Sequence, residues 1–108
     1  MMSSENEQYS VIDNEAEDQY EVHAEGEVAI LTYQRQGKRI TFYHTEVPPA
    51  LEGRGIAGML ARTALEAARA DGLEVVPLCP YVAAYIRRHQ EYLPLVSKPY
   101  QAKITERQ

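Results

Sequence analysis

The feature that most constrains the fold is a change of hydrophobic period at the segment VPPALEGRGIAG, residues 47–58. Before it, apolar and polar residues alternate as in strands, and after it, apolar residues recur with a period of about 3.6, as in a helix. Two prolines and three glycines lie in the segment itself. Proline fixes φ and removes a donor, whereas glycine permits left-handed or very close backbone geometry. We therefore predict a conformationally constrained loop that is a candidate binding site.

The stretches before this loop have the composition of strands. YEVHA, GEVAILTYQ and RITFYHT are rich in β-branched and aromatic residues, and the intervening EGE and QRQGK each contain a glycine suited to a hairpin turn. Val11 and Ile12 indicate a short first strand before the polar stretch DNEAEDQ. Together these patterns predict an antiparallel meander.

The stretches after the loop indicate a helix, a strand and a second helix. The first helix is expected over residues 55–71, with Gly72 as its stop. LEVVPL resembles a strand buried on both faces, and Cys79 with Pro80 opens a second helix, YVAAYIRRH. From Gln90 onward, two prolines and weak periodicity predict a loop and a loosely held tail.

This order predicts an α/β fold with one small domain and a mixed, mostly antiparallel sheet of about five strands. A crossover helix would follow the fourth strand, and a short helix the fifth. The expected organisation is a disordered acidic tail over residues 1–8, a folded domain over 9–97 and a C-terminal tail over 98–108.

Composition excludes several classes of protein. The chain has 108 residues and a net charge of -5, which argues against non-specific binding to nucleic acid or an anionic membrane. No apolar run reaches the roughly 18 residues that span a bilayer, and no signal peptide is evident, so we expect a cytoplasmic protein. One cysteine allows no intramolecular disulfide, and the three spread histidines predict no metal centre.

Two interpretations of the glycine-rich loop remain open from the residues alone. A helix N-terminus offers unpaired amides and partial positive charge, so the loop suits a phosphate. It ends in neither the Gly-Lys-Ser/Thr of a Walker loop nor a GxGxxG pattern. The other interpretation is a tight strand-to-helix turn that needs glycine for packing.

The spacing of Val47, Pro49, Gly53 and Gly55, followed by Ile56, resembles the pyrophosphate loop of GCN5-related N-acetyltransferases, Val-x-Pro-x-x-Arg-Gly-x-Gly-Ile-Gly. HTEVPPALEGRG together with VVPLCPYVAAYIRRHQEYLPLV is similar to the minimal, YjdJ-type group of this family, which lacks the usual N-terminal helices. The resemblance covers about residues 9–97.

The resemblance implies binding of acetyl-CoA and transfer of its acetyl group to a small amine or a protein amine. The backbone at Val47 would lie along the pantetheine and thioester. The pyrophosphate would meet the amides of Gly53, Arg54, Gly55, Ile56, Ala57 and Gly58. This sequence departs from the family at Glu52, where Gln or Arg is usual, and at Cys79, near the place of an Asn that contacts the cofactor.

Three side chains are candidates for the chemistry. His44 is the preferred base, with Glu46 on the same strand face, because histidine exchanges protons near neutral pH. Cys79 begins a helix, where the thiolate is favoured, and could accept the acyl group and pair with His44. Tyr85, or alternatively Tyr81, would protonate the departing thiolate. For each, structural packing is the competing interpretation.

Two functions follow from these candidates. The first is an acetyl-CoA-dependent N-acetyltransferase, acting by direct transfer or through acyl-Cys79. The alternative is a non-catalytic acyl-CoA-binding module that acts with a protein partner. The basic run Arg87, Arg88 and His89 either complements a helix dipole or contacts the 3'-phosphate of CoA or an acidic partner.

Overall fold

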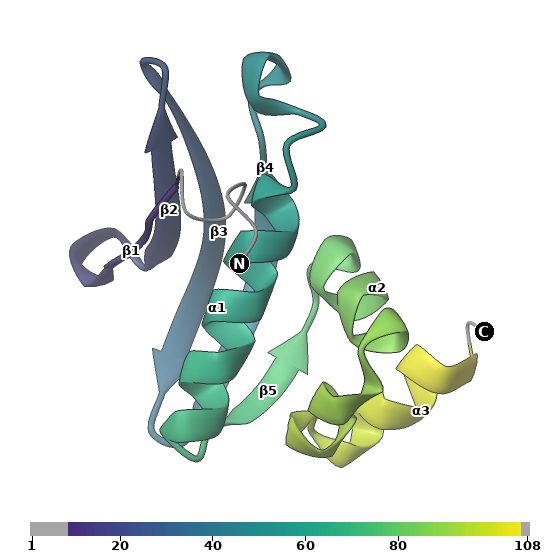
Figure 1. Cartoon of the computed structure of the whole chain (residues 1–108). Helices are drawn as coiled ribbons and strands as arrows, with labels where there is room; N and C mark the ends of the chain where they lie inside the picture. The colour runs from purple at the N-terminus through teal and green to yellow at the C-terminus, as the bar shows by residue number, and fades with distance from the viewer. Residues whose placement is uncertain (1–8, 107–108) are drawn as a thin grey trace, which may run out of the picture.

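The strands of the sheet lie side by side in the order in which they occur along the chain (Figure 1). A computed structural model describes residues 9–106, so the predicted tail over residues 1–8 lies outside the described part. The elements are β1 (Val11–Asn14), η2 (Glu15–Glu17), β2 (Gln19–Ala24), β3 (Glu27–Gln36), β4 (Arg39–Glu46), η3 (Pro49–Leu51), α1 (Ile56–Ala70), β5 (Glu74–Pro77), α2 (Pro80–Arg88), η4 (Gln90–Leu95) and α3 (Lys98–Glu106).

The first four strands form the predicted antiparallel meander. Their tight turns use residues with positive φ, including Gly26 at 76° and Gly37 at 57°. Alternate residues of β3, such as Leu31 and Tyr33, are buried, while their neighbours face the other side of the sheet. The short first strand expected at Val11 is also present.

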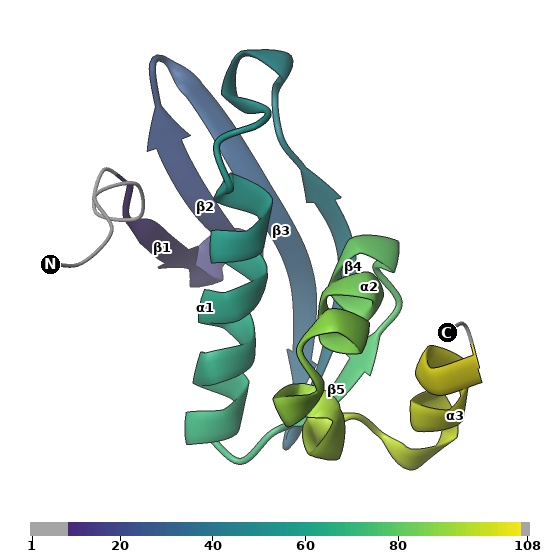
Figure 2. The ribbon, with the colours of Figure 1, turned by 45° about the vertical axis from the view of Figure 1, so that its right-hand side comes forward.

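Helix α1 connects β4 to β5 and covers one face of the sheet. It packs on β2 and β3, and α2 packs beside it on β4 and β5 (Figure 2). Gly55 caps its start, and Gly72, with φ 67°, follows its end, as predicted. Strand β5 pairs parallel with β4, from Arg39 opposite Glu74 onward. The mixed five-stranded sheet and its crossover helix are therefore confirmed.

A bulge in β4 reverses the direction in which its side chains point. Thr32 pairs with His44 but the next residue, Tyr33, pairs with Phe42, which leaves Tyr43 as an extra residue. Before the bulge, Phe42 points into the core. After it, Thr45 contacts Cys79 on the helix side, whereas His44 is exposed on the opposite face.

The segment from Gln90 onward is not the loop and loosely held tail that its prolines suggested. It forms η4 and then α3, which packs on α2. Tyr92, Val96 and Ile104 are buried in the core, and the amide of Ser97 donates to the carbonyl of Val75 at 2.9 Å. The prediction was wrong for two reasons. A 3₁₀ turn accommodates Pro94 without ending the structure. The buried apolar residues lie at multiples of four positions apart, but the break between η4 and α3 interrupts the helical pattern that this spacing would otherwise show.

No helix within residues 9–106 has both the length and the apolar character needed to cross a membrane.

The uncovered face of the sheet carries a buried carboxylate, Glu21. Asn14 and Gln19 donate to its Oε2 at 2.8 and 2.7 Å, and His23 Nε2 lies 2.7 Å from its Oε1. These hydrogen bonds lower the pKa of Glu21 to about 2, and the one from Gln19 has the largest effect on it. The network joins β1 to β2 at the edge of the sheet.

Because the folded state holds this pKa below its usual value, Glu21 stabilises the fold fully above about pH 4.5 and stops doing so as pH falls through about 2. We predict that Glu21→Gln lowers the free energy of unfolding at pH 7 by about 1–3 kcal/mol. The gap between variant and parent should close between pH 4.5 and 2 in urea titrations. Exposed Glu27→Gln is the matched control, and a gap that is independent of pH would contradict the assignment.

Candidate functional site

The loop between β4 and α1 is ordered by its prolines and glycines together. Pro48 and Pro49 lead into η3, whose Leu51 is fully buried and fixes the loop to the core. Beyond it, Gly53 and Gly55 have φ of 81° and 77°, a conformation that L side chains rarely adopt. The loop therefore reaches the start of α1 through two left-handed residues.

Arg54, between these glycines, contacts the β2–β3 turn. Its guanidinium donates to both carboxylate oxygens of Glu25, at 2.5 and 3.3 Å, and to the hydroxyl of Tyr9 at 3.2 Å. The hydrogen bonds from Arg54 lower the pKa of Glu25. The sequence placed Arg54 among the cofactor ligands but gave no sign of this ion pair, because its partner lies 29 residues away. One contact thus ties the loop to the hairpin.

The first turn of α1 presents unpaired donors. Gly55 has no side chain to cap the helix, and the first helical hydrogen bond runs from Met59 to the carbonyl of Gly55. Within residues 9–106, no group accepts a hydrogen bond from the amides of Ile56, Ala57 or Gly58. These amides and the partial positive charge of the helix end suit an anion.

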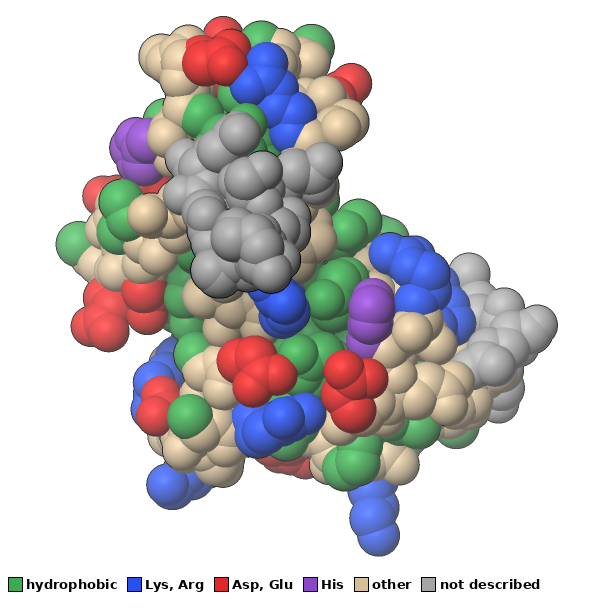
Figure 3. All heavy atoms as spheres, viewed as in Figure 1, with side chains coloured by type: hydrophobic (Ala, Val, Ile, Leu, Met, Phe, Trp, Pro, Cys, Tyr) green, Lys and Arg blue, Asp and Glu red, His purple; other side chains and the backbone are tan. Residues whose placement is uncertain are grey.

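An open pocket of about 200 Å³ lies where α1 begins, against α2. It is lined by Gly55, Gly58, Met59, Arg62 and Tyr85, so two predicted cofactor residues and one predicted catalytic residue share a site. Figure 3 shows hydrophobic side chains exposed where α1 meets α2, with basic groups beside them. Local sequence patterns do not mark Arg62 as a site residue, because its place in the pocket depends on the packing of α2 against α1.

Gly58 of α1 faces two tyrosines of α2. A Cβ at this position would lie 3.6 Å from the hydroxyl of Tyr81 and 3.9 Å from the ring of Tyr85. Tyr85 stacks on His89, with ring centroids 4.1 Å apart. Burial, the largest influence, raises the pKa of Tyr85, so the phenol keeps its proton at neutral pH.

The other two candidates for the chemistry are not brought together. The side chain of Cys79 is 1% exposed, and its sulfur lies 3.2 Å from the hydroxyl of Thr45. His44 is exposed and lies 3.7 Å from Glu46, so the expectation that these two share a face is confirmed. The predicted pairing of Cys79 with His44 is wrong because the bulge at Tyr43 turns His44 to the other face of the sheet.

The basic run at the end of α2 is divided between different surroundings. His89 stacks on Tyr85, whereas Arg87 lines a groove between α2 and α3. Neither Arg87 nor Arg88 forms an ion pair within the described part of the chain. In the same part, no three His, Cys, Asp or Glu side chains are grouped as metal ligands.

The fold and the loop together define a class of protein. Residues 19–95 match the family of GCN5-related N-acetyl-transferases, and this match includes β2, β3, β4, the glycine-rich loop, α1, β5 and α2. The chain belongs to that family.

Similar curated proteins are the Protein NATD1 of several vertebrates. The chain is 42% identical over 62 residues to those of Homo sapiens and Gallus gallus, which covers 56% of this chain and 55% and 56% of theirs. It is 35% identical over 68 residues to that of Danio rerio. The matched part thus spans about half the length of the human and chicken proteins.

The two glycines of the first helical turn should respond oppositely to the same substitution. Gly55→Ala should lower the free energy of unfolding by about 1–2 kcal/mol, because alanine is strained at positive φ. Gly58→Ala should leave stability unchanged or raise it by up to about 1 kcal/mol, because this glycine is helical and the new methyl group meets Tyr81 at ordinary contact distance. Urea unfolding measures both, and equal losses would show that the loop geometry is misassigned.

Proposed function

We propose that this domain binds acetyl-CoA at the start of α1 and transfers the acetyl group directly to an amine. The observation that carries the proposal is the set of unpaired amides of residues 56–58, which follow two left-handed glycines and open onto the pocket of Tyr85. Family membership supports the same cofactor.

In this proposal the pyrophosphate lies against the amides of the loop and first helical turn. The helix dipole favours its negative charge, and the absence of a Cβ at Gly55 lets the phosphate oxygens approach the backbone. Arg62, one turn further along α1, lines the same pocket and supplies a full positive charge. Glu52 is exposed, so its carboxylate has room to stay in solvent.

The chemical step needs few side chains. The neutral amine would attack the thioester carbon, so that the C–N bond forms and the C–S bond breaks. The thiolate would take the phenolic proton of Tyr85, and the proton that the acylated nitrogen loses would return to the Tyr85 phenolate through solvent. The amide of Val47 would polarise the carbonyl oxygen. His44 with Glu46 would take the proton of the incoming ammonium only if the acceptor reaches the uncovered face of the sheet.

We favour direct transfer over an acyl-cysteine intermediate. The thiol of Cys79 is enclosed in the core and engaged with Thr45, so a thioester could not reach it without opening the packing between β4 and α2. Cys79 then acts as a small buried residue.

The alternative is an acyl-CoA-binding module without turnover, which acts with a protein partner. The separation of His44 from the pocket of Tyr85 favours this alternative, because neither His44 nor Glu46 lines that pocket. The cytoplasmic location stays a prediction in both cases.

Calorimetric titration with CoA and acetyl-CoA tests the binding site. Gly55→Ala should weaken CoA binding at least about tenfold, because the new Cβ and the strained φ both disturb the pyrophosphate cradle. Gly72→Ala is the matched control, since Gly72 also has positive φ but lies beyond the other end of α1. Equal CoA affinity in parent and Gly55→Ala would contradict the proposal.

Release of CoA with a panel of primary amines tests the chemistry. Tyr85→Phe should reduce turnover by about 100-fold with little change in CoA affinity, whereas Tyr81→Phe should change both by less than about threefold. Cys79→Ala should retain turnover, and intact mass should show no acetyl adduct on Cys79. CoA binding without turnover in any protein would support the binding module instead.

A further inference from the structure

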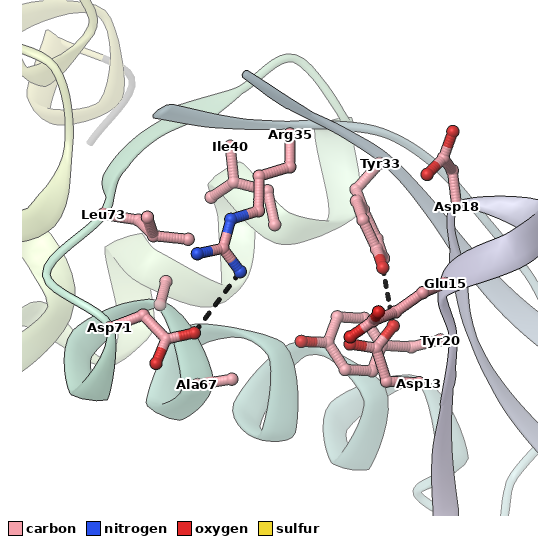
Figure 4. A pocket seen from close by; sticks show the side chains of 11 residues that line it. Asp13, Glu15, Asp18, Tyr20, Tyr33, Arg35, Ile40, Ala67, Asp71 and Leu73 are labelled. Atoms are coloured by element: carbon pink, nitrogen blue, oxygen red, sulfur yellow. Dashed lines mark hydrogen bonds and ion pairs between the residues drawn. The ribbon is translucent and has the colours of Figure 1, made fainter. Parts of the chain in front are cut away.

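A second and larger pocket lies at the far end of α1. It has a volume of about 430 Å³ and is enclosed by the β1–β2 segment, β3 and the last turn of α1 (Figure 4). It is separated from the glycine-rich loop by roughly 15 Å of helix. Local sequence patterns do not indicate this pocket, because its residues come from four separate segments. Its size is in the usual range for a small-molecule site.

Negative charge predominates in this pocket. Four carboxylates line it, with Arg35 as its one basic residue. Arg35 Nη1 lies 3.4 Å from Asp71 Oδ2, and the hydroxyl of Tyr33 donates to Asp13 at 2.6 Å. The remaining carboxylates, those of Glu15 and Asp18, have no side-chain partner within residues 9–106. The electrostatic potential of this pocket therefore stabilises a bound cation more than a bound anion.

Tyr20 is a largely buried residue whose hydroxyl is open to this pocket. Only 6% of the residue is exposed, and no group in the described part of the chain makes a hydrogen bond with its hydroxyl. Its ring lies against that of Tyr33, with centroids 5.4 Å apart, and Figure 4 shows its hydroxyl directed into the pocket above α1. Burial, followed by the charges of Asp13 and Asp71, raises the pKa of Tyr20 to about 12, so the phenol is neutral.

The other wall of the pocket carries apolar residues beside the pair of Arg35 and Asp71 (Figure 4). Ala67 and Ala68 of α1, with Ile40 and Leu73, present small or aliphatic side chains to it. A ligand that suits both walls carries a positive charge and several donors at one end and a short hydrocarbon segment at the other.

We propose that this pocket binds a protonated primary amine on a short alkyl chain. The ammonium donates to the Tyr20 hydroxyl oxygen and to the carboxylates of Asp13 and Glu15, and the alkyl chain lies on Ala67, Ala68 and Leu73. Such a group is found in free diamines and in lysine side chains. The site is separate from the proposed acyl-CoA site and does not depend on the function proposed for it.

NMR titration of the whole chain with n-butylammonium chloride tests the site. The resonances of Tyr20, Tyr33 and Ala67 should shift, with a dissociation constant on the order of 1 mM. Tyr20→Phe should weaken binding at least about fivefold, and Glu15→Gln should also weaken it. Glu27→Gln is the matched control, because it removes the same charge from an exposed site outside the pocket. Thermal unfolding checks that each variant is folded.

Comparison of 1,5-diaminopentane with Nα-acetyl-lysine methylamide then distinguishes a free amine from a lysine side chain. Tighter binding of either compound supports the site and shows whether the amine it binds is a free diamine or a lysine side chain. Three results would overturn the proposal: no shifts at the pocket, equal binding of n-butanol or butanoate, or displacement of the amine by an equal concentration of calcium. Unchanged affinity in folded Tyr20→Phe would remove the role given to its hydroxyl.

Discussion

The packing of α1 across the sheet is the interaction on which the remaining features depend. Its apolar face is buried against β2 and β3, and truncating a leucine such as Leu60 or Leu65 in a site of this kind costs about 2–5 kcal/mol. This packing fixes both ends of the helix at once. One end presents unpaired amides beside α2, and the other closes a pocket against β1 and β3. The glycines at both ends allow the chain to enter and leave a helix whose position the core has already determined.

A second constraint is the bulge at Tyr43. Without the extra residue, His44 would continue the alternation of Phe42 and point toward the helices. With it, Thr45 takes that position and contacts Cys79, and His44 joins Glu46 on the uncovered face. The bulge thus separates two residues that share the same end of neighbouring strands. It also leaves Tyr85 as the candidate for chemistry that lies in the pocket at the start of α1.

Sequence predicted the features that local rules control. The meander, the limits of α1 and the proline-initiated α2 each follow from periodicity, turn residues and caps within a few positions. It could not predict the bulge, because both strand patterns look alike until pairing sets the register. It also missed α3, because the apolar residues of this helix are buried only by packing on α2. The pairing of Arg54 with Glu25 was missed because 29 residues separate them in the chain. The candidate site was predicted in part. Gly55, Gly58 and Tyr85 line one pocket, whereas Cys79 contacts Thr45 in the core and His44 lies beside Glu46 on the uncovered face.

The central claim is that the unpaired amides at the start of α1 hold the pyrophosphate of CoA. Titration of the isotope-labelled protein with CoA, followed through backbone amide resonances, tests it most directly. We predict that the largest shifts fall on residues 53–58, because their amides gain a charged acceptor. The amides around Tyr20, at the other end of α1, should not move. No shifts over residues 53–58 at saturating CoA, or shifts centred elsewhere, would contradict the account.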